Sequence, residues 1–563
     1  MTRLRFRSLG VLISIFLCVN VQGAEIIEPD WSEGIAIPEE GRANIYQLPE
    51  DQYRKLILKG KVHALNYPVD VTGILLPFDG FERFFKNNRD SWLQKLIGRV
   101  FGSQLGFQSV DDIESWLGLY SYPEKSSPLA SVEKLPLDML DDTSRRMGSS
   151  LINRHGVNGL TYSCGACHVG ELFGEKVLGM PTRFPRANLS FKLGKSAMGL
   201  LPRAIVNQFF RSTPEEEKLI EELDRNIKAT GGRYPQVLGL DTSLAHVALS
   251  LAHRSLDEYA TKDARWERFP RFDMLKSQAA DSKPGTWWLL KYKNRWLSDG
   301  SIRSGNPIFT NILWNEIGRG TDLFELERWL EDNQTKVQEL TAAVFSIQAP
   351  RYEDFFPAES IELATAKKGH KLFSSNCSRC HGEYEKAWDQ PNAATLSLRE
   401  QLQTTKVKYF EQTPVVDVGT DRLRRQGMAS LEQLNDLAIS RSFGTIVKES
   451  KGYVPPPLVG VWARWPYFHN NSAPSLCAVL TKSEHRPKRY TPVEAMDRNR
   501  DFDRACNGYP LTRSIINANT KTFDSRKQGL GNQGHDEGIF LRDGEEIYTA
   551  DEKMAIIHFL QTL

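Results

Sequence analysis

Helical spacing of apolar residues is the dominant local pattern in this chain. Residues 214–232 combine apolar positions three and four apart with a proline at the start and a Gly-Gly pair at the end, which predicts a helix. Residues 320–348 and 430–442 carry the same spacing. Alternating, strand-like patterns are sparse, and glycine and proline punctuate most of the remaining chain. The pattern predicts a mainly α fold with long loops.

Two further helices are predicted in the C-terminal part of the chain. Residues 364–382 have a helical apolar pattern that runs into a pair of cysteines. The final segment, 549–563, begins with a capping box formed by Thr549 and Glu552. Its apolar residues fall on one face of the predicted helix: Met554, Ile557 and Leu560.

The first residues have the basic, apolar and small layout of a secretory signal peptide. Three arginines precede an apolar run from Leu9 to Val21, and small residues follow. The run is shorter than the about 20 apolar residues that cross a bilayer. We expect residues 1–24 to be removed, leaving no integral membrane segment, and the protein to be periplasmic or secreted by Gram-negative-type bacterial export.

The length and net charge of the chain bear on its number of domains and on its possible partners. The chain has 563 residues and a formal net charge of +2. Because a chain of this length is longer than a single hydrophobic core usually serves, we expect two domains or more, with a boundary near residue 350. No basic patch or charge run indicates a nucleic-acid partner.

The seven cysteines are unevenly placed. One lies in the predicted signal peptide, and four lie in two Cys-x-x-Cys-His pentapeptides, at residues 164–168 and 377–381. The remaining two, Cys477 and Cys506, are 29 positions apart, and in an oxidising compartment we expect them to form a disulfide. Two unrelated buried thiols are the alternative.

Cys-x-x-Cys-His is the attachment signature of c-type haem. The two thiols lie about one helical turn apart to bond the haem vinyl groups, and the following histidine is the proximal ligand of the iron. The predicted residues that bind two such haems are Cys164, Cys167, His168, Cys377, Cys380 and His381.

Two other chemistries use part of this pattern. A four-thiolate zinc site would use both Cys-x-x-Cys pairs as ligands, and these two pairs lie unusually far apart in the sequence. A redox dithiol needs a thioredoxin-like α/β domain, which no part of the sequence indicates. The repeated histidine favours haem, and so predicts two cytochrome c-like haem domains, at residues 25–350 with a large insertion and at residues 351–563.

Several stretches resemble a known family. Residues 364–382 resemble the first helix of class I cytochrome c domains, whereas residues 157–172 lack such an approach helix. The segments 284–301, 418–424, 453–480 and 531–563 together resemble exported di-haem c-type cytochromes related to bacterial cytochrome c peroxidases, in particular the rubber oxygenase-like branch. Within Pro466–Ser472, Asn471 stands where the family usually has glycine, a mild departure because asparagine also tolerates positive φ.

The resemblance also implies axial ligands. Its oxygenase-like branch has a Gly-His pair before the last helix, and His535 matches the histidine that is the distal ligand of the C-terminal haem. Met428 is an alternative distal ligand for that haem, and His469 is a third candidate. The matching family segment places Trp287 and Trp288 near the N-terminal haem, for which no distal ligand is evident. The other histidines are interpreted as structural or surface residues.

Three functions are consistent with this reading. The first is a haem-dependent oxygenase that activates O2 at the N-terminal haem and cleaves a carbon–carbon double bond of an unsaturated substrate. The second is a cytochrome c peroxidase that reduces H2O2 with electrons from a small redox protein, for which no distal acid–base residue is evident. The third is a non-catalytic electron-transfer cytochrome, which requires a sixth ligand on both irons.

Overall fold

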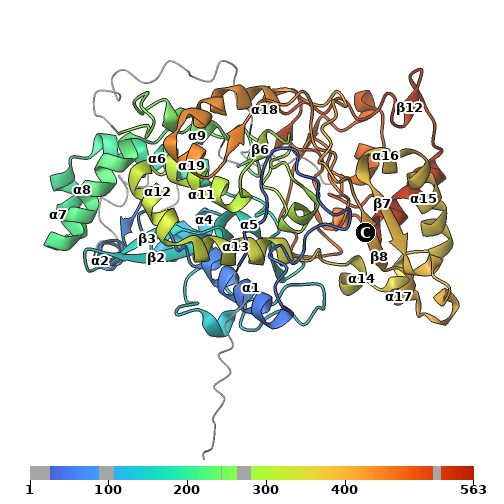
Figure 1. Cartoon of the computed structure of the whole chain (residues 1–563), viewed down its shortest axis with the longest axis horizontal. Coiled ribbons are helices and arrows are strands. Elements are labelled where there is room, and N and C mark those ends of the chain that lie inside the picture. Colours follow the sequence, from blue (N-terminus) through green and yellow to red (C-terminus); the bar gives the residue numbers. More distant parts are fainter. Residues whose placement is uncertain (1–25, 88–106, 242–243, 263–280, 512–521) are drawn as a thin grey trace, which may run out of the picture.

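The computed structural model describes residues 26–87, 107–241, 244–262, 281–511 and 522–563. The predicted signal peptide lies outside these residues. The molecule is elongated, with the helices around residues 200–228 at one end and those that flank the second Cys-x-x-Cys-His motif at the other (Figure 1). None of the helices in the described part of the chain is long and apolar enough to span a bilayer.

Helices form most of the regular structure, which confirms the predicted mainly α class. The longer helices are α1 (Glu50–Leu65), α2 (Phe78–Asn87), α6 (Ala187–Leu200), α7 (Arg203–Phe210), α8 (Pro214–Lys228), α9 (Leu244–Leu251), α11 (Pro307–Gly318), α12 (Leu323–Asp332), α13 (Gln334–Ser346), α15 (Leu363–Asn376) and α21 (Ala550–Gln561). The shorter ones are α4 (Val110–Trp116), α5 (Gly165–His168), α14 (Tyr352–Phe355), α16 (Ser378–His381), α17 (Leu398–Gln401), α18 (Leu423–Gln426), α19 (Ala438–Ser442) and α20 (Leu476–Val479). The 3₁₀ helices are η1 (Leu137–Met139), η2 (Trp287–Tyr292), η3 (Ala358–Ser360), η4 (Ala387–Asp389), η5 (Ala393–Thr395), η6 (Gly427–Asp436), η7 (Val461–Ala463) and η8 (Ser483–His485).

The strands are short and pair in small antiparallel sheets, which the sequence did not predict individually. One sheet has three strands in the order β1 (Leu76–Pro77), β3 (Val157–Tyr162) and β2 (Ser149–Arg154). The pairs are β4 (Val169–Leu172) with β5 (Glu175–Leu178), β6 (Ile302–Ser304) with β9 (Ile446–Val447), β7 (Glu383–Lys386) with β8 (Thr404–Lys408), β10 (Arg489–Tyr490) with β11 (Phe523–Asp524), and β12 (Leu541–Arg542) with β13 (Glu545–Glu546). Strands of two to six residues are too short for a clear period-two signal.

Local sequence accounts for the ends of the predicted helices. α8 begins after Thr213, which forms a capping box with Glu216, and α21 begins with the predicted box between Thr549 and Glu552. The segment 320–348 folds as two helices, α12 and α13, separated at Asn333. Both capping boxes satisfy amide groups that the first turn of a helix leaves unpaired.

The predicted helix over 430–442 is confirmed in part, because the segment forms two helices of different types. Its first part belongs to η6, and an extended Leu437 separates η6 from the short helix α19. In η6 the buried side chains of Met428, Leu431 and Leu434 recur every three residues, which is the period of a 3₁₀ helix.

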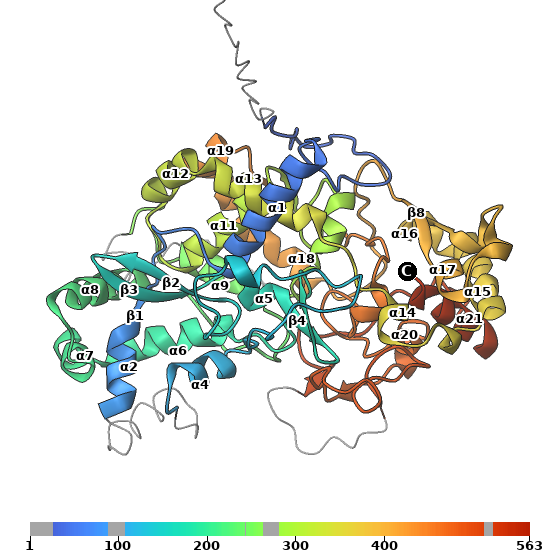
Figure 2. The same ribbon diagram turned by 90° about the horizontal axis from the view of Figure 1, so that it is seen from below.

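One continuous hydrophobic core contains residues from both sides of position 350. Two helix pairs build much of it, α1 with α13 and α15 with α21, and both views show each pair side by side (Figure 2). Glycine permits the close approach in each pair, because a Cβ atom at Gly60 would lie 1.9 Å from the Glu339 carbonyl oxygen and one at Gly369 would lie 1.8 Å from that of Ala555. The division into two haem domains stays a prediction.

Candidate functional site: two Cys-x-x-Cys-His turns around one cavity

The first Cys-x-x-Cys-His motif follows a strand. Strand β3 ends at Tyr162, and the chain then turns through α5, in which the His168 amide donates to the Cys164 carbonyl at 3.0 Å. The turn packs against Gly148, whose φ is +95° and where a Cβ atom would lie 2.3 Å from the Ala166 nitrogen. The β2–β3 hairpin therefore replaces the approach helix that is missing from the sequence here.

The second motif follows a helix, as its resemblance to class I cytochromes predicts. Helix α15 ends at Asn376, and the His381 amide donates to the Cys377 carbonyl at 3.0 Å, the same bond as in the first motif. Gly382, with φ +78°, then turns the chain into β7. Because a single helical turn separates the cysteines, both thiols and the histidine can face one planar group.

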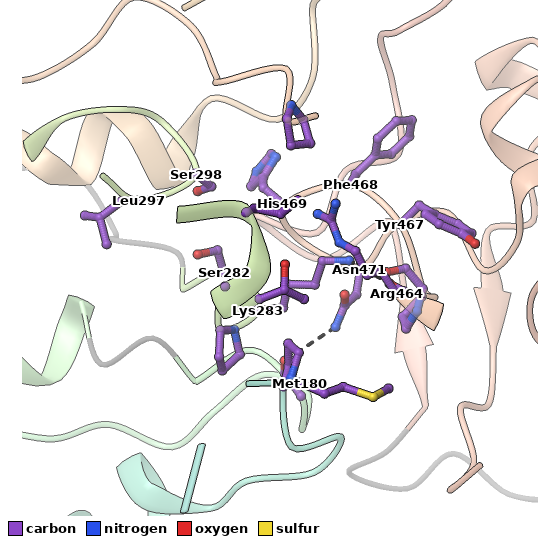
Figure 3. Close-up of a pocket in the computed structure, with 18 of the residues that line it drawn as sticks. Met180, Ser282, Lys283, Leu297, Ser298, Arg464, Tyr467, Phe468, His469 and Asn471 are labelled. Carbon is purple, nitrogen blue, oxygen red and sulfur yellow. Dashed lines mark hydrogen bonds between the residues drawn. The ribbon is translucent and has the colours of Figure 1, made fainter. Parts of the chain in front are cut away.

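Both motifs line the same cavity of about 560 Å3. Its walls are predominantly apolar and aromatic, and they come from segments spread over most of the chain. Figure 3 shows part of this wall, including Met180, Lys283, Arg464 and His469, and the hydrogen bond from the Asn471 amide to the Gly239 carbonyl. The cavity belongs to the class that holds cofactors and small ligands.

His381 faces a second histidine across the cavity. The ring centroids of His381 and His535 are 6.3 Å apart. Two imidazoles bound to one metal through bonds of about 2 Å would have their centroids roughly 6 Å apart. The Nδ1 atom of His381 lies 2.8 Å from the Pro456 carbonyl oxygen, which orients the ring with Nε2 available. The spacing therefore fits a pair of axial ligands.

The electrostatics of this pair also fit metal ligation. Burial lowers the pKa of His535 to about 3 and lowers that of His381 as well, so both imidazoles are neutral near pH 7 and keep a lone pair for a metal. His535 has a positive φ of 56° and follows Gly534, where a Cβ atom would lie 2.3 Å from the Gly419 carbonyl carbon. The Gly-His pair is thus held by backbone packing against the loop at 418–424.

The two alternative ligands, Met428 and His469, are not paired with His381. Met428 is fully buried in η6 and is not among the residues that line the cavity. His469 does line the cavity, but its ring stacks on Tyr453 with centroids 3.9 Å apart.

His168 has a different neighbour. Its ring packs against Trp287, with centroids 5.1 Å apart and planes 37° apart. Burial lowers the pKa of His168 to about 4, and the Gly285 backbone opposes part of this shift. Of the two tryptophans predicted near this haem, Trp287 lines the cavity, whereas Trp288 points into the core and donates from its indole to the Val459 carbonyl at 3.0 Å.

The thiols differ from those of a redox dithiol. Burial raises the pKa of Cys164 to about 11 and the pKa values of Cys167 and Cys377 to about 12. Reactive dithiols have depressed pKa values, so this environment disfavours thiolate chemistry. Within the described residues the two cysteine pairs do not join into a metal-binding group. The predicted disulfide between Cys477 and Cys506 is confirmed.

Sequence reasoning missed several residues that line the cavity. Asp241 is buried beside Asp281, and this burial raises its pKa well above the ordinary value. His246, interpreted from the sequence as structural or surface, is a cavity residue whose ring stacks on Phe191 with centroids 4.3 Å apart. Both lie far in sequence from the attachment motifs, and no local pattern marks them.

Comparison with known proteins supports a cytochrome. The family described as RoxA-like, cytochrome c-like, matches residues 452–491, the stretch that carries His469 and part of the cavity wall. This match and the two attachment turns indicate a haem-binding, cytochrome c-like protein with covalently bound haem c.

Two bacterial relatives are similar to longer parts of the chain. The uncharacterized protein y4iJ of Sinorhizobium fredii is 25% identical over 313 residues, which cover 46% of this chain and 48% of that protein. The uncharacterized protein y4iM of the same bacterium is 26% identical over 207 residues, which cover 33% of this chain and 44% of that protein. The chain spans about half the length of the curated relatives that it matches.

Proposed function

We propose that this protein is an exported di-haem c-type oxidoreductase with one electron-transfer haem and one oxygen-activating haem. The observation that carries the proposal is the asymmetry between the two attachment histidines. His381 faces the imidazole of His535, whereas the ring contact of His168 is with Trp287. Bis-histidine ligation suits electron transfer, while an iron without a protein ligand on its second side is available to a small oxidant.

The histidines and the methionine that line the cavity support this asymmetry. His246 lies between Phe191 and Gly318, where a Cβ atom would be 2.7 Å from its Nε2, and His469 stacks on Tyr453. Met180 lies with its sulfur against Gly170, just beyond the first attachment turn. Of the cavity-lining histidines and methionine in the described part of the chain, only His535 thus lies against an attachment histidine.

The reaction proposed for the His168 site is oxidative cleavage of a carbon–carbon double bond. A haem at this site would supply the activation of O2, and both oxygen atoms would enter the products, so that one C=C bond becomes two carbonyl groups without an external reductant. The protein would supply a predominantly apolar cavity wall against which an alkene can pack. The similarity of residues 452–491 to RoxA-like cytochromes supports this reaction class.

Spectroscopy and product analysis of the purified protein test the proposal. We expect an EPR spectrum with one high-spin and one low-spin ferric haem, and O2 uptake with formation of aldehydes or ketones from squalene or polyisoprene. Two low-spin haems and no O2 uptake would contradict both the open site and the oxygenase reaction, and would leave an electron carrier.

A second candidate, H2O2 reduction, is favoured by Asp241. Peroxide reduction consumes two protons and two electrons for each H2O2, and it needs a group that delivers protons. Asp241 lines the cavity near Cys167, and its burial beside Asp281 raises the pKa of its carboxyl, which favours the protonated form that can donate a proton. Oxidation of a reduced small cytochrome c by H2O2, lost in Asp241→Asn with normal haem content, would support this function over the oxygenase.

A further inference from the structure

The cavity is lined by an excess of positive charge. Seven arginine and lysine side chains line it, whereas Asp241 is the only acidic residue among the described residues that do so. One of the cations has a carboxylate partner: Arg319 pairs with Glu316 at 3.2 Å. Arg186 and Arg379 donate to the backbone carbonyls of Trp116 and Gly538, and Arg379 is exposed while Arg186 is half-buried. The other four are Arg183, Lys283, Lys293 and Arg464.

These four cations have no carboxylate partner among the described residues. The Nε and Nη1 atoms of Arg464 are buried without a hydrogen bond, as are Nε and Nη2 of Arg183. The remaining Nη1 atom of Arg183 donates to the Trp465 carbonyl at 3.1 Å and to the Tyr509 hydroxyl at 3.0 Å. The Nζ atom of Lys283 donates only to backbone carbonyls, those of Arg464 at 3.2 Å and of Pro466.

Burial of these charges is costly without an anion. Burial lowers the pKa of Lys293 to about 7 and that of Arg464 to about 10, and it also depresses the pKa of Lys283, on which Arg464 and Arg183 act in the same direction. Mutually repelling cations in an enclosed site destabilise the protein unless something negative compensates them. The charge of the cavity wall at these residues therefore favours anionic groups.

The cluster also lies between the two attachment sites. Lys283 precedes Gly285, whose backbone interacts with His168, and it is bonded to the Arg464 backbone. Arg464 in turn acts electrostatically on both His381 and Lys293. Figure 3 shows Lys283 and Arg464 together in the pocket wall.

We propose that Arg183, Lys283, Lys293 and Arg464 form one binding site for the propionate carboxylates of both haems. This inference rests on the proposed function, since it requires two attached haems. Each haem carries two propionates, so four carboxylates would balance the charge of these four cations. Arginine suits this role because its planar fork binds a carboxylate through two parallel hydrogen bonds.

A shared cationic site has a consequence for both irons. Positive charge beside a haem favours the reduced state, which carries one positive charge fewer. Removing one cation from the cluster should therefore lower the midpoint potentials of both haems. A site that served one haem alone would shift one potential only.

Redox titration of the holoprotein, followed by optical spectroscopy, tests the inference with Arg464→Gln and Lys283→Gln. We expect both midpoint potentials to fall in each variant and Arg464→Lys to retain most of the wild-type values. The matched control is Lys291→Gln, which removes one buried charge from η2, bonded to Gln348, outside the cavity lining. We expect the control to leave both potentials unchanged.

Haem content, measured as the pyridine haemochrome, separates the two ways in which the inference can fail. Wild-type protein without two covalent haems would overturn the proposed function and this inference with it. Two haems with unchanged potentials in Arg464→Gln and Lys283→Gln, or with an equal shift in Lys291→Gln, would overturn the propionate site alone. If Arg464→Gln does not fold, Lys283→Gln and Arg464→Lys still decide the question.

Discussion

Replacing Gly369 with alanine should separate α15, the helix that precedes the second Cys-x-x-Cys-His motif, from α21. Gly369 lies in α15, and a Cβ atom there would be 1.8 Å from the Ala555 carbonyl oxygen and 2.4 Å from its carbon, both in the backbone of α21. Real Cβ atoms essentially never approach within 3.0 Å. The helix axes must therefore move apart by more than about 1 Å, since no rotamer change can relieve a contact with backbone.

Two effects of opposite sign determine how much Gly369→Ala changes the free energy of unfolding. Alanine is a better helix former than glycine by about 1 kcal/mol. Against this, separation of the helices weakens a buried interface that includes Phe373 and Phe559, whose ring centroids are 5.1 Å apart. A gap of about 1 Å forfeits up to half of the dispersion energy of such contacts, and overpacking costs about 3 kcal/mol at its usual upper end. We expect a net loss of about 2 kcal/mol in the free energy of unfolding.

Gly194→Ala is the matched control. Gly194 lies inside α6, where a Cβ atom would meet only the Ile227 side chain, at an ordinary 3.6 Å. The same substitution should therefore stabilise the protein by about 0.5–1 kcal/mol. Urea unfolding followed by circular dichroism and Soret absorbance measures both variants. If the Gly369→Ala protein were as stable as the Gly194→Ala protein, the argument that α15 and α21 cannot accommodate a Cβ atom at Gly369 would be refuted.

Three other variants test separate features. His535→Ala should convert one low-spin haem to high spin in the EPR spectrum, and His535→Met should restore low spin at a higher potential; an unchanged spectrum would exclude His535 as a ligand. The double change Cys477→Ala/Cys506→Ala should lower the free energy of unfolding by about 3–4 kcal/mol, from the entropy of a 29-residue loop, and equal urea midpoints for the two proteins would contradict this. For His246, burial lowers the pKa from 6.5 to about 4. Between pH 6.5 and 4 the unfolded state therefore binds more protons than the folded state. The stability that depends on neutral His246 is complete above pH 6.5 and is lost as the pH falls. At pH 5 the loss is about 2 kcal/mol, so His246→Phe should reduce the change in unfolding free energy between pH 7.5 and 5 by this amount, and an unaltered change would show that His246 is not the titrating group.

The features that the sequence predicted well are local ones. A capping box needs only Thr549 and Glu552 three residues apart, and the turn of a Cys-x-x-Cys-His motif needs only five consecutive residues, so the intervening backbone fixes their geometry. Haem attachment at these turns stays a prediction. The disulfide between Cys477 and Cys506 was predicted because no other cysteines remained after the two motifs were assigned. By contrast, the 3₁₀ form of η6 was not predicted, because a spacing of three between apolar residues occurs in both 3₁₀ and α helices.

Tertiary structure decided what surrounds the two motifs. The His381–His535 contact joins residues 154 positions apart, and family resemblance rather than physical reasoning from the residues indicated it. The cation cluster draws on residues 183, 283, 293 and 464, which no sequence period connects. That none of the described carboxylates pairs with them can be recognised only when neighbouring segments are in place. The sequence by itself therefore determined which chemical groups the chain carries and where it can attach a cofactor. Folding alone determined which of those groups share one enclosed space, because burial and charge balance depend on contacts between distant parts of the chain.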